Sequence, residues 1–371
     1  MNIVEAFDGV YRGKTVLVTG HTGFKGSWLI MWLLLLGARV VGYSLYLPSK
    51  PSIFEVCRLQ EHITDEKEDI RDFTALSRVI HKYRPEIIFH LAAQPLVTKS
   101  YDNAKYTFDT NVGGTVNILE SLKDTTTVRA AVLITSDKCY KNVEWVWGYR
   151  EIDELGGDDP YSASKACSEL VCRSYASSFF LDRNAPRIAT ARAGNVIGGG
   201  DWAESRIIPD CVRAFSSSEQ VVIRNPTATR PWQHVLEPLS GYLLAGAELF
   251  RSRGIHGEAF NFGPSLKADI SVQELLQTFA RYWGDVKWQF EKDHNSKRES
   301  TLLRLNCDKA LQILKWHPVL IFDDTARLTA EWYKAHYQGC ANMHDFSNKQ
   351  IVYYFNKAKE IGLHWAKMNK G

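Results

Sequence analysis

The sequence predicts an α/β protein built around a doubly wound parallel sheet, with a second and smaller α/β unit. Three observations support this prediction. Short apolar segments alternate with helical segments over the first 195 residues, as in parallel sheets that helices cover on both faces. A glycine-rich turn follows the first predicted strand. A loop-rich region broken by Pro209, Pro226, Pro231 and Pro238 follows the last one.

Length and composition agree with a globular protein of this class. The chain has 371 residues, and at roughly 150 residues per domain this length predicts two structural units. Apolar residues make up 45% and charged residues 23%, so a large core can form and wholesale disorder is excluded. A net charge of +3 argues against a dedicated nucleic-acid-binding protein, which would carry a basic excess.

Cysteine usage and hydropathy indicate a soluble protein of the reducing cytoplasm. The seven cysteines are an odd number without a C-x-x-C pair, which argues against disulfides and against a bound metal. The first fourteen residues lack the apolar core of a secretory signal. The longest apolar run, Trp28 to Leu36, is far shorter than the about 20 residues of a membrane span, so we expect a buried helix and no membrane partner.

Residues 15–43 are predicted to form a strand, a helix and a second strand. Thr15–Val18 is apolar and β-branched without polar alternation, as in a strand buried on both faces. Gly20, Gly23 and Gly26 follow at three-residue intervals and open a helical segment that Gly37 ends. Because such glycines let the backbone approach a pyrophosphate at a helix N-terminus, the turn favours dinucleotide binding over a purely structural role.

The same alternation continues and completes the sheet. Further buried strands are expected at 38–43, 87–91, 130–134 and 187–192, with helices at 73–83 and 112–123. Repeated strand–helix units of this kind form a parallel, Rossmann-type sheet. Ligands of such sheets lie beyond the carboxyl ends of the strands, so we expect the chemistry there.

The second, interleaved C-terminal α/β substrate domain begins where Gly198–Gly200 opens a loop-rich stretch. We assign residues 1–195 plus 232–265 to the dinucleotide-binding domain and residues 196–231 plus 266–371 to the smaller domain. Helices are expected at 239–250, 272–283 and 324–337. The tail from Asn342 is expected to be a helical appendage, with a solvated face formed by Lys357, Lys359, Lys367 and Lys370.

Tyr161 and Lys165 are the first candidate catalytic pair. Asp159 is suited to cap a helix and Pro160 to begin it, which places Tyr161 and Lys165 one turn apart on one face. An ammonium group close to a phenol favours the phenolate and lowers its pKa from about 10. The alternative is a packed aromatic ring beside a surface lysine, which is the commoner role of such a pair.

A second candidate group follows the predicted strand 130–134 directly. Thr135, Ser136, Asp137 and Lys138 place hydroxyls, a carboxyl group and an amine at the carboxyl edge of the sheet, where they suit acid–base chemistry. The alternative is a polar turn without further role. The glycine turn, this cluster and the Tyr-x-x-x-Lys pair occur together and in this order, which favours the catalytic interpretation.

These motifs together resemble the extended short-chain dehydrogenase/reductase family, and within it the nucleotide-sugar 4,6-dehydratases. The resemblance covers nearly the whole chain and includes the segments 145–151, 192–202 and 230–235, which are more specific than the glycine trio. It implies NAD as the cofactor. The contacts that it implies are Gly20, Thr22, Gly23, Phe24, Lys25, Gly26, Asp69, Ile70, Leu91, Ala92, Ala93, Tyr161 and Lys165.

The resemblance also implies the reaction. Tyr161, as phenolate, takes the proton from the sugar O4 while hydride leaves C4, and Ser136 holds O4. Lys138 then removes the C5 proton that the 4-ketone acidifies, while protonated Asp137 donates to the departing O6. Hydride returns to C6 and leaves a 4-keto-6-deoxy sugar. Many relatives carry Glu where Lys138 stands, so this base is a hypothesis that requires a neutral amine.

Substrate contacts are assigned by charge and by family motif. A diphosphate favours arginine, whose planar fork binds oxygens in pairs. The residues alone lead to a hexose carried on a diphosphate, whereas cytidine, and hence CDP-glucose, comes from the resemblance. Trp202 and Trp232 either stack on the base or pack the second unit, and packing is the commoner role. The candidate substrate contacts are Gln94, Ser136, Asn195, Arg206 and Arg230.

The end of the second strand leaves the choice between NAD and NADP open. Ser44, Leu45 and Tyr46 stand where a ribose-binding acid is expected. Ser44 is suited to a ribose hydroxyl, whereas Lys50 or Arg58 would tolerate a phosphate. Cofactor recycling and the resemblance favour NAD.

Two rival functions remain beside the dehydratase. A 4-epimerase or reductase of the same family shares the Tyr-x-x-x-Lys pair but needs no acid–base pair for elimination, so Asp137 and Lys138 favour the dehydratase. A non-catalytic dinucleotide sensor has no use for an activated phenol.

The resemblance further implies a homodimer or dimer of dimers, formed through helices near 106–119 and 167–180. It also implies that the product leads to a deoxysugar of a bacterial surface polysaccharide.

Overall fold

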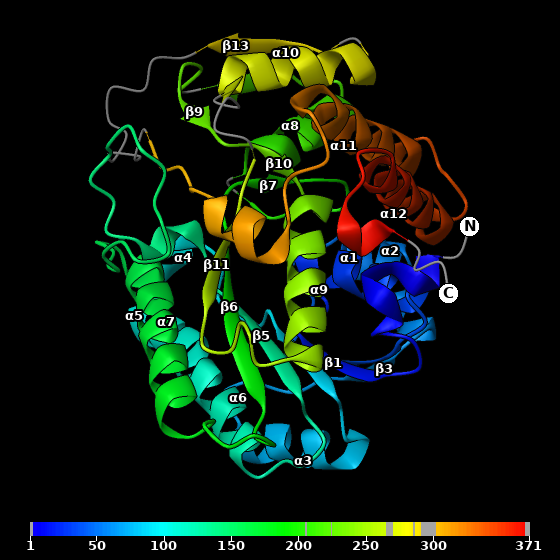
Figure 1. Ribbon diagram of the computed structural model, residues 1–371. Helices are drawn as coiled ribbons and strands as arrows, with labels where there is room; N and C mark the ends of the chain where they lie inside the picture. The colour runs from blue at the N-terminus through cyan, green and yellow to red at the C-terminus, as the bar shows by residue number, and fades with distance from the viewer. Residues whose placement is uncertain are drawn as a thin grey trace.

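A seven-stranded parallel sheet forms the centre of the molecule (Figure 1). The computed structural model describes residues 3–204, 206–223, 225–264, 270–284, 286–290 and 302–367. The strands follow the order β11-β6-β5-β4-β1-β2-β3, and each neighbouring pair is parallel. They are β1 (Thr15–Thr19), β2 (Arg39–Tyr43), β3 (Thr64–Glu66), β4 (Ile87–His90), β5 (Ala130–Ile134), β6 (Arg187–Ala193) and β11 (Ala259–Phe262). The predicted sheet is confirmed, and β3 and β11 are additions to it.

Helices cover both faces of this sheet. In β1, Val16 and Val18 join the apolar cluster that contains α1 and α9, whereas Leu17 joins the cluster that contains α3, α6 and α7. This alternation is the two-residue period of a strand buried on both faces, so the doubly wound fold class is confirmed. The helices are α1 (Phe24–Leu35), α3 (Phe73–Tyr83), α6 (Gly114–Lys123), α7 (Pro160–Ser178) and α9 (Leu236–Arg251).

Short elements complete the sheet region. The predicted helix 112–123 begins differently, because a π-helical turn at Asp109–Gly113 precedes α6. The apolar run from Trp28 is a buried helix as predicted, since Trp28 to Leu33 lie inside the core. The remaining helices here are the 3₁₀ turns Ile3–Gly9, Leu59–Glu61 and Asp137–Cys139 and the helices α2 (Ile53–Val56), α4 (Val97–Asp102) and α5 (Ala104–Phe108).

A second group of elements lies beyond the carboxyl edge of the sheet, where Figure 1 shows α8, α10 and β13. Its helices are α8 (Ile207–Ser216), α10 (Val272–Trp283) and α11 (Phe322–Tyr337), with a π-helical turn at Ala310–Leu314. Three two-stranded sheets join them: β7 (Val196–Ile197) with β10 (Gln233–His234), β9 (Thr229–Arg230) with β12 (Ile270–Ser271), and β8 (Val221–Ile223) with β13 (Trp288–Phe290).

The tail is helical as predicted, but it belongs to the core. Helix α12 (Met343–Glu360) and the 3₁₀ turn His364–Ala366 pack against α1, and Tyr354 and Trp365 are buried beside Trp32. An amphipathic helix with this many large apolar residues buries them wherever a complementary face exists, and α1 supplies it. Of the tail lysines, Lys357 pairs with Asp324 at 3.0 Å, Lys367 is exposed, and Lys370 lies outside the described residues.

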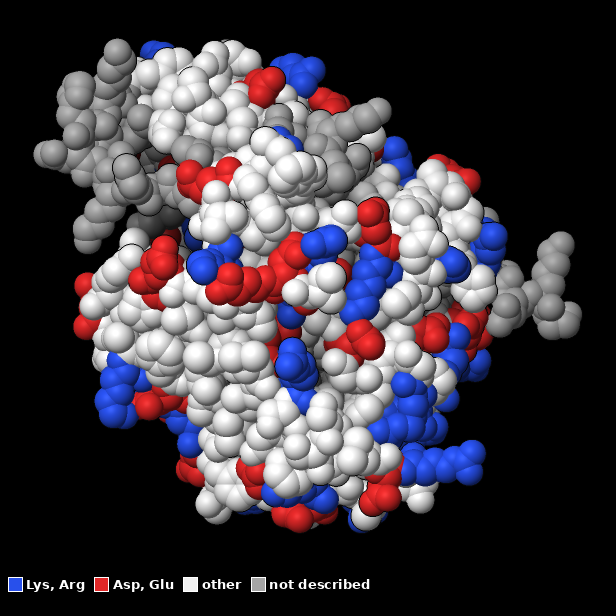
Figure 2. Space-filling view, turned by 60° about the vertical axis from the view of Figure 1, so that its left-hand side comes forward, with Lys and Arg blue, Asp and Glu red and all other residues white. Residues whose placement is uncertain are grey.

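The face of the molecule in Figure 2 carries charges of both signs. Acidic and basic side chains are interspersed across the face shown in Figure 2, without one broad basic area. None of the helices among the described residues combines the length and the apolar character that crossing a bilayer requires.

Candidate active site

The glycine turn between β1 and α1 is built for close backbone approach. Gly20 has a φ of +69°, and a Cβ there would lie 2.7 Å from the backbone nitrogen of Ala92. A Cβ on Gly26 would lie 2.3 Å from the carbonyl oxygen of Gly20. Gly23 caps α1 without a side-chain hydrogen bond. The turn is therefore pressed against the end of β4 and presents a helix N-terminus, the arrangement that a dinucleotide pyrophosphate requires.

The other predicted cofactor contacts line the same edge of the sheet. Ser44 follows β2, and its hydroxyl lies 2.8 Å from that of Thr22 in the glycine turn. Asp69 pairs with Arg71 at 2.5 Å and lines an open surface groove with Asn117. Asn117 donates to the carbonyl oxygen of Ile70 at 2.9 Å. A hydroxyl and a carboxylate thus stand beside the turn, where ribose and adenine contacts are predicted.

The predicted catalytic turn leaves β5 at the carboxyl edge. Ser136 caps a 3₁₀ turn, because its Oγ accepts from the backbone nitrogen of Lys138 at 3.2 Å, and it donates to Asp137 Oδ1 at 2.9 Å. Asp137 is buried, and Gly194 at the end of β6 leaves room for its carboxyl group. Burial raises the pKa of Asp137, against the opposing charges of Lys138 and Lys25. A raised pKa is what a carboxyl group needs to hold a proton for donation.

Helix α7 begins as predicted and brings Tyr161 and Lys165 to this turn. Asp159 accepts from the backbone nitrogen of Ser162 at 3.0 Å, and Pro160 opens the helix. Burial raises the pKa of Tyr161 to about 12, while its hydrogen-bonding contact with Ser136 and the charge of Arg206 lower it. Ser136 and Tyr161 therefore meet, as the catalytic interpretation requires.

The amine of Lys165 is tied to the end of β5. Its Nζ donates to the carbonyl oxygen of Ile134 at 3.2 Å. Burial lowers its pKa to about 8, and the carboxylate of Glu169, one turn further along α7, raises it. The charge of Arg206 lowers the pKa of the Tyr161 phenol, a role for which the sequence patterns did not single it out.

Lys25 also faces the catalytic turn. It was predicted as a member of the glycine turn, and its charge interacts with Asp137, Arg206 and Lys165. Burial lowers its pKa to about 8. Its Nζ lies 6.0 Å from the ring centre of Tyr242 on α9, whose hydroxyl is buried without a hydrogen-bond partner. The motif gave Lys25 as a cofactor contact, whereas no motif indicated Tyr242.

The predicted substrate contacts are spread over several elements. Arg206 pairs with Asp201 at 2.7 Å and lies close enough to Tyr161 to act on its pKa. Arg230 stands in β9, where its Nη1 donates to the carbonyl oxygen of Thr229 at 2.8 Å. Asn195 follows β6, and its carbonyl oxygen accepts from the backbone nitrogen of Gln233 at 3.1 Å. Its effect on the Tyr161 pKa places Arg206 at the catalytic turn.

Gln94 and the two tryptophans have structural partners. The Gln94 amide donates to Thr107 at 3.0 Å and accepts from the backbone nitrogen of Leu96 at 2.7 Å. Buried Asn111, which the sequence analysis missed, accepts from the Gln94 backbone nitrogen at 2.8 Å. Trp202 packs among the aromatic rings of α11, and Trp232 donates to the carbonyl oxygen of Ile270 at 3.2 Å. For both tryptophans the packing alternative agrees with the structure.

A buried ion pair beneath the catalytic turn was also missed. Arg192 and Glu169 join β6 to α7 at 2.8 Å, and each side chain is 3% exposed. A signal was present in the sequence, since Glu169 falls on the Tyr161–Lys165 face and Arg192 ends a predicted buried strand. Charges at such positions require a partner of opposite sign. Among the described residues, no cluster of His, Cys, Asp and Glu has the make-up of a metal site.

Comparison with known proteins gives the same class of enzyme. The model of the GDP-mannose 4,6-dehydratase family matches residues 17–329. A CDP-glucose 4,6-dehydratase of Salmonella typhimurium is 48% identical over 334 residues, which cover 89% of this chain and 93% of that protein. The chain belongs to this family of nucleotide-sugar dehydratases, within the extended short-chain dehydrogenases/reductases.

Solved structures of this kind share the fold. A dTDP-glucose 4,6-dehydratase of Bacillus anthracis in complex with NAD superimposes with a TM-score of 0.73 at 21% identity, covering 88% of this chain and 98% of that chain. A UDP-glucose 4-epimerase of Stenotrophomonas maltophila with bound NAD gives a TM-score of 0.77 at 23% identity, covering 88% and 100%. Dehydratases and epimerases thus share this architecture, and the side chains of the site must distinguish them.

Proposed function

We propose that the chain is a CDP-glucose 4,6-dehydratase, a hydro-lyase that converts CDP-D-glucose into CDP-4-keto-6-deoxy-D-glucose with NAD. The observation that carries the proposal is the 48% identity to the Salmonella typhimurium enzyme over 89% of the chain. The convergence of Ser136, Asp137, Lys138 and Tyr161 at the carboxyl edge of the sheet supports it.

The cofactor site fits NAD. The glycine turn would hold the pyrophosphate at the start of α1, Ser44 a ribose hydroxyl, and Asp69 with Ile70 the adenine. NAD, when bound, supplies a hydride acceptor that is oxidised again within one turnover. The segment 91–93 would border the cofactor beside the glycine turn, because a Cβ on Gly20 would collide with Leu91 and Ala92.

Tyr161, Ser136 and Lys165 carry the oxidation. Tyr161 accepts the proton of the sugar O4, and Ser136, which already contacts Tyr161, holds O4. Burial works against the phenolate, so positive charge is required; Arg206 supplies it at this edge, and the Lys165 ammonium, one turn along α7 from Tyr161, would add to it. Loss of the C4 hydrogen then leaves a ketone that acidifies the hydrogen on C5.

Asp137 and Lys138 carry the elimination. Asp137 is buried with a raised pKa, which favours the protonated carboxyl group that would donate to the departing O6. Lys138 lies next to it, only partly exposed, and removes the C5 proton. A 4-epimerase needs neither group, so this pair is what sets the proposal apart from that rival.

The substrate's nucleotide would be held by Arg206, Arg230 and Asn195, and its sugar would lie near Gln94.

The proposal includes the division into a dinucleotide-binding part, 1–195 with 232–265, and a nucleotide-sugar-binding part, 196–231 with 266–371. It also includes a cytoplasmic location, a deoxysugar of a surface polysaccharide as the eventual product, and a homodimer. Exposed apolar side chains on and beside α7, Leu170 and Phe179 among them, support a contact between two copies.

An end-point assay tests the proposal. The purified chain, given NAD and CDP-glucose, is expected to form a product that absorbs in base as a 4-keto sugar, and Tyr161→Phe is expected to form none. Parallel reactions with UDP-, dTDP- and GDP-glucose test the base, and reconstitution with NADP tests the cofactor. A C4 epimer instead of the keto sugar, or product from another nucleotide sugar alone, would contradict the proposal.

The acid and base are tested separately. In deuterated water, Lys138→Ala is expected to lose both turnover and exchange at C5, while the hydride step at C4 continues. Asp137→Asn is expected to retain exchange at C5 and lose water elimination. Normal C5 exchange and turnover in Lys138→Ala would remove Lys138 from its role.

A further inference from the structure

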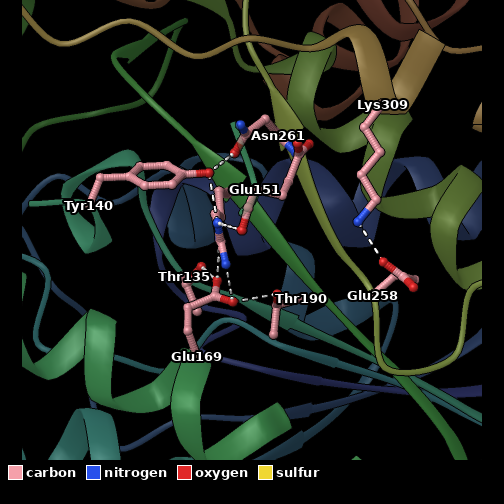
Figure 3. Close-up of polar contacts among 9 residues, drawn as sticks. Thr135, Tyr140, Glu151, Glu169, Thr190, Glu258, Asn261 and Lys309 are labelled. Carbon is pink, nitrogen blue, oxygen red and sulfur yellow. Dashed lines mark hydrogen bonds and ion pairs between the residues drawn. The ribbon is translucent and has the colours of Figure 1, made fainter. Parts of the chain in front are cut away.

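The buried pair of Glu169 and Arg192 lies directly beneath the catalytic turn. The Glu169 carboxylate accepts from the Thr135 hydroxyl, from Thr190 Oγ1 at 2.7 Å, and from Arg192 Nε and Nη2 at 2.9 and 2.8 Å. Figure 3 shows this carboxylate between Thr135 and Thr190. Four donors on one carboxylate fix its position, since each lost contact would leave a buried polar group without a partner.

The guanidinium of Arg192 reaches the other end of the same turn. Its Nη1 donates to the Tyr140 hydroxyl at 2.7 Å and to the carbonyl oxygen of Glu151 at 3.2 Å. Tyr140 in turn donates to Asn261 Oδ1 at 2.8 Å, as Figure 3 shows. Thr135 and Tyr140 flank residues 136–139, which include Ser136, Asp137 and Lys138, so one ion pair is anchored on both sides of the catalytic turn.

The same pair is linked to the other catalytic element. Glu169 lies on α7 at four-residue spacing from Lys165 and at eight from Tyr161, so all three face the sheet edge. Burying two charges costs several kcal/mol per ion, and a buried ion pair is weak support for stability on its own. A role in specifying the geometry of the turn explains why the fold holds the pair there.

We propose that the Glu169–Arg192 ion pair is a positioning unit, which sets the catalytic turn 136–138 against Tyr161 through its contacts to Thr135 and Tyr140. The inference rests on the proposed function, because it takes Ser136, Asp137 and Lys138 to be the reacting groups. Neither Glu169 nor Arg192 touches the substrate in this role. Both act through the residues that flank the turn.

The two threonines on Glu169 provide a matched test. Thr135 and Thr190 are both buried, and each donates its hydroxyl to the same carboxylate, but only Thr135 adjoins the catalytic turn. Thr135→Val is expected to lower kcat by tenfold or more while KM for CDP-glucose changes less than about twofold, because small displacements of reacting groups cost about this much. Thr190→Val is expected to keep kcat within about threefold of the wild type at a similar loss of Tm.

Two further variants separate positioning from a general loss of packing. Thr135→Ser keeps the hydroxyl and is expected to restore kcat, whereas Tyr140→Phe keeps the ring and removes the contact to Arg192, so kcat is expected to fall. Equal kcat losses in Thr135→Val and Thr190→Val, in step with their Tm values, would overturn the inference. So would full activity in Thr135→Val.

A crystal structure of Thr135→Val keeps the two proposals distinguishable. If the wild type forms no keto sugar from CDP-glucose, the proposed function fails, yet the displacement of Ser136 from Tyr161 still decides the inference. A displaced turn in Thr135→Val but not in Thr190→Val supports the positioning unit. An unmoved turn in both overturns it.

Discussion

Two buried carboxylates in this molecule have opposite electrostatic surroundings. Glu169 lies at the catalytic edge of the sheet, where Arg192 pairs with it at 2.8 Å. Glu237 lies on α9, at the junction with the C-terminal segment, and accepts from the backbone nitrogens of Val319 and Leu320 and from the Tyr354 hydroxyl at 2.7 Å. Among the described residues, no ion pair reaches Glu237.

The difference appears in their protonation. Burial alone raises the pKa of either group, but the charge and hydrogen bonds of Arg192 hold the pKa of Glu169 below its ordinary value. At Glu237 burial prevails, and the pKa rises to about 7. Neutral donors therefore do not replace a cation when a carboxylate is withdrawn from water. The catalytic edge keeps a fixed charge, whereas the junction holds a group that titrates near neutral pH.

The largest expected effect comes from removing the cation. Arg192→Met leaves Glu169 buried and unpaired, so we expect the free energy of unfolding to fall by roughly 3–5 kcal/mol. Urea unfolding at pH 7 measures it. As a control, Arg281→Met breaks the exposed Arg281–Asp323 pair, which contributes at most about 1 kcal/mol. Similar losses in the two variants would mean that the buried Glu169–Arg192 pair contributes no more to the free energy of unfolding than an exposed pair does.

The next effect is a dependence on pH that has opposite signs in the two regions. Between pH 4.5 and about 7 folded Glu237 keeps the proton that the unfolded chain releases, so its contribution to stability falls as pH rises through this range. Glu169, whose folded pKa is lowered, contributes stability above its unfolded pKa and loses it as pH falls.

Glu237→Gln isolates the first of these signs. A pKa raised from 4.5 to about 7 corresponds to roughly 3 kcal/mol. The free energy of unfolding of the variant, relative to that of the wild type, is therefore expected to rise by about this amount between pH 4.5 and pH 8. Unfolding by urea at a series of pH values measures the difference. A difference that stays constant with pH would show that folding does not raise the pKa of Glu237.

Most of the sheet region was predictable because its signals are local. The strands Ala130–Ile134 and Thr15–Thr19 are short apolar and β-branched runs, which favour a buried strand. The pair Asp159-Pro160 marks the start of α7. The catalytic candidates follow from these elements, since a residue after a parallel strand lies at the carboxyl edge. The catalytic roles that the sequence motifs assign to these residues remain predictions.

The contacts between distant segments were not predictable in this way. Nothing near Arg206 in the sequence indicates that it acts on Tyr161, and Glu237 meets Tyr354 across more than a hundred residues. The tail was expected on the surface because its lysines are evident in the sequence, whereas the face that buries Tyr354 and Trp365 is supplied by α1. Such partners are set by tertiary packing, which a local pattern does not record.

The smallest expected effect lies at the junction. Tyr354→Phe removes one neutral donor from Glu237 and a contact of 3.0 Å to Ser240, and it retains the packed ring. We expect a loss of about 1–2 kcal/mol in the free energy of unfolding, the cost of a buried hydrogen bond whose acceptor keeps other donors. The pKa of Glu237 is expected to rise further, since the Tyr354 hydroxyl lowers it.

Turnover in Tyr354→Phe then tests whether the two regions are independent. Within the part of the chain that the structure describes, the hydrogen bonds and ring contacts of Tyr354 go to Glu237, Ser240, Trp32 and Trp365, away from the catalytic turn. We therefore expect kcat to stay within about twofold of the wild type. Tyr353→Phe, which removes a part-buried contact of 3.1 Å to Asp324, is the matched control for stability. A loss of kcat in Tyr354→Phe as large as that in Thr135→Val would show that the junction also sets the geometry of the catalytic edge, and that a fixed charge at Glu169 is not enough to hold it.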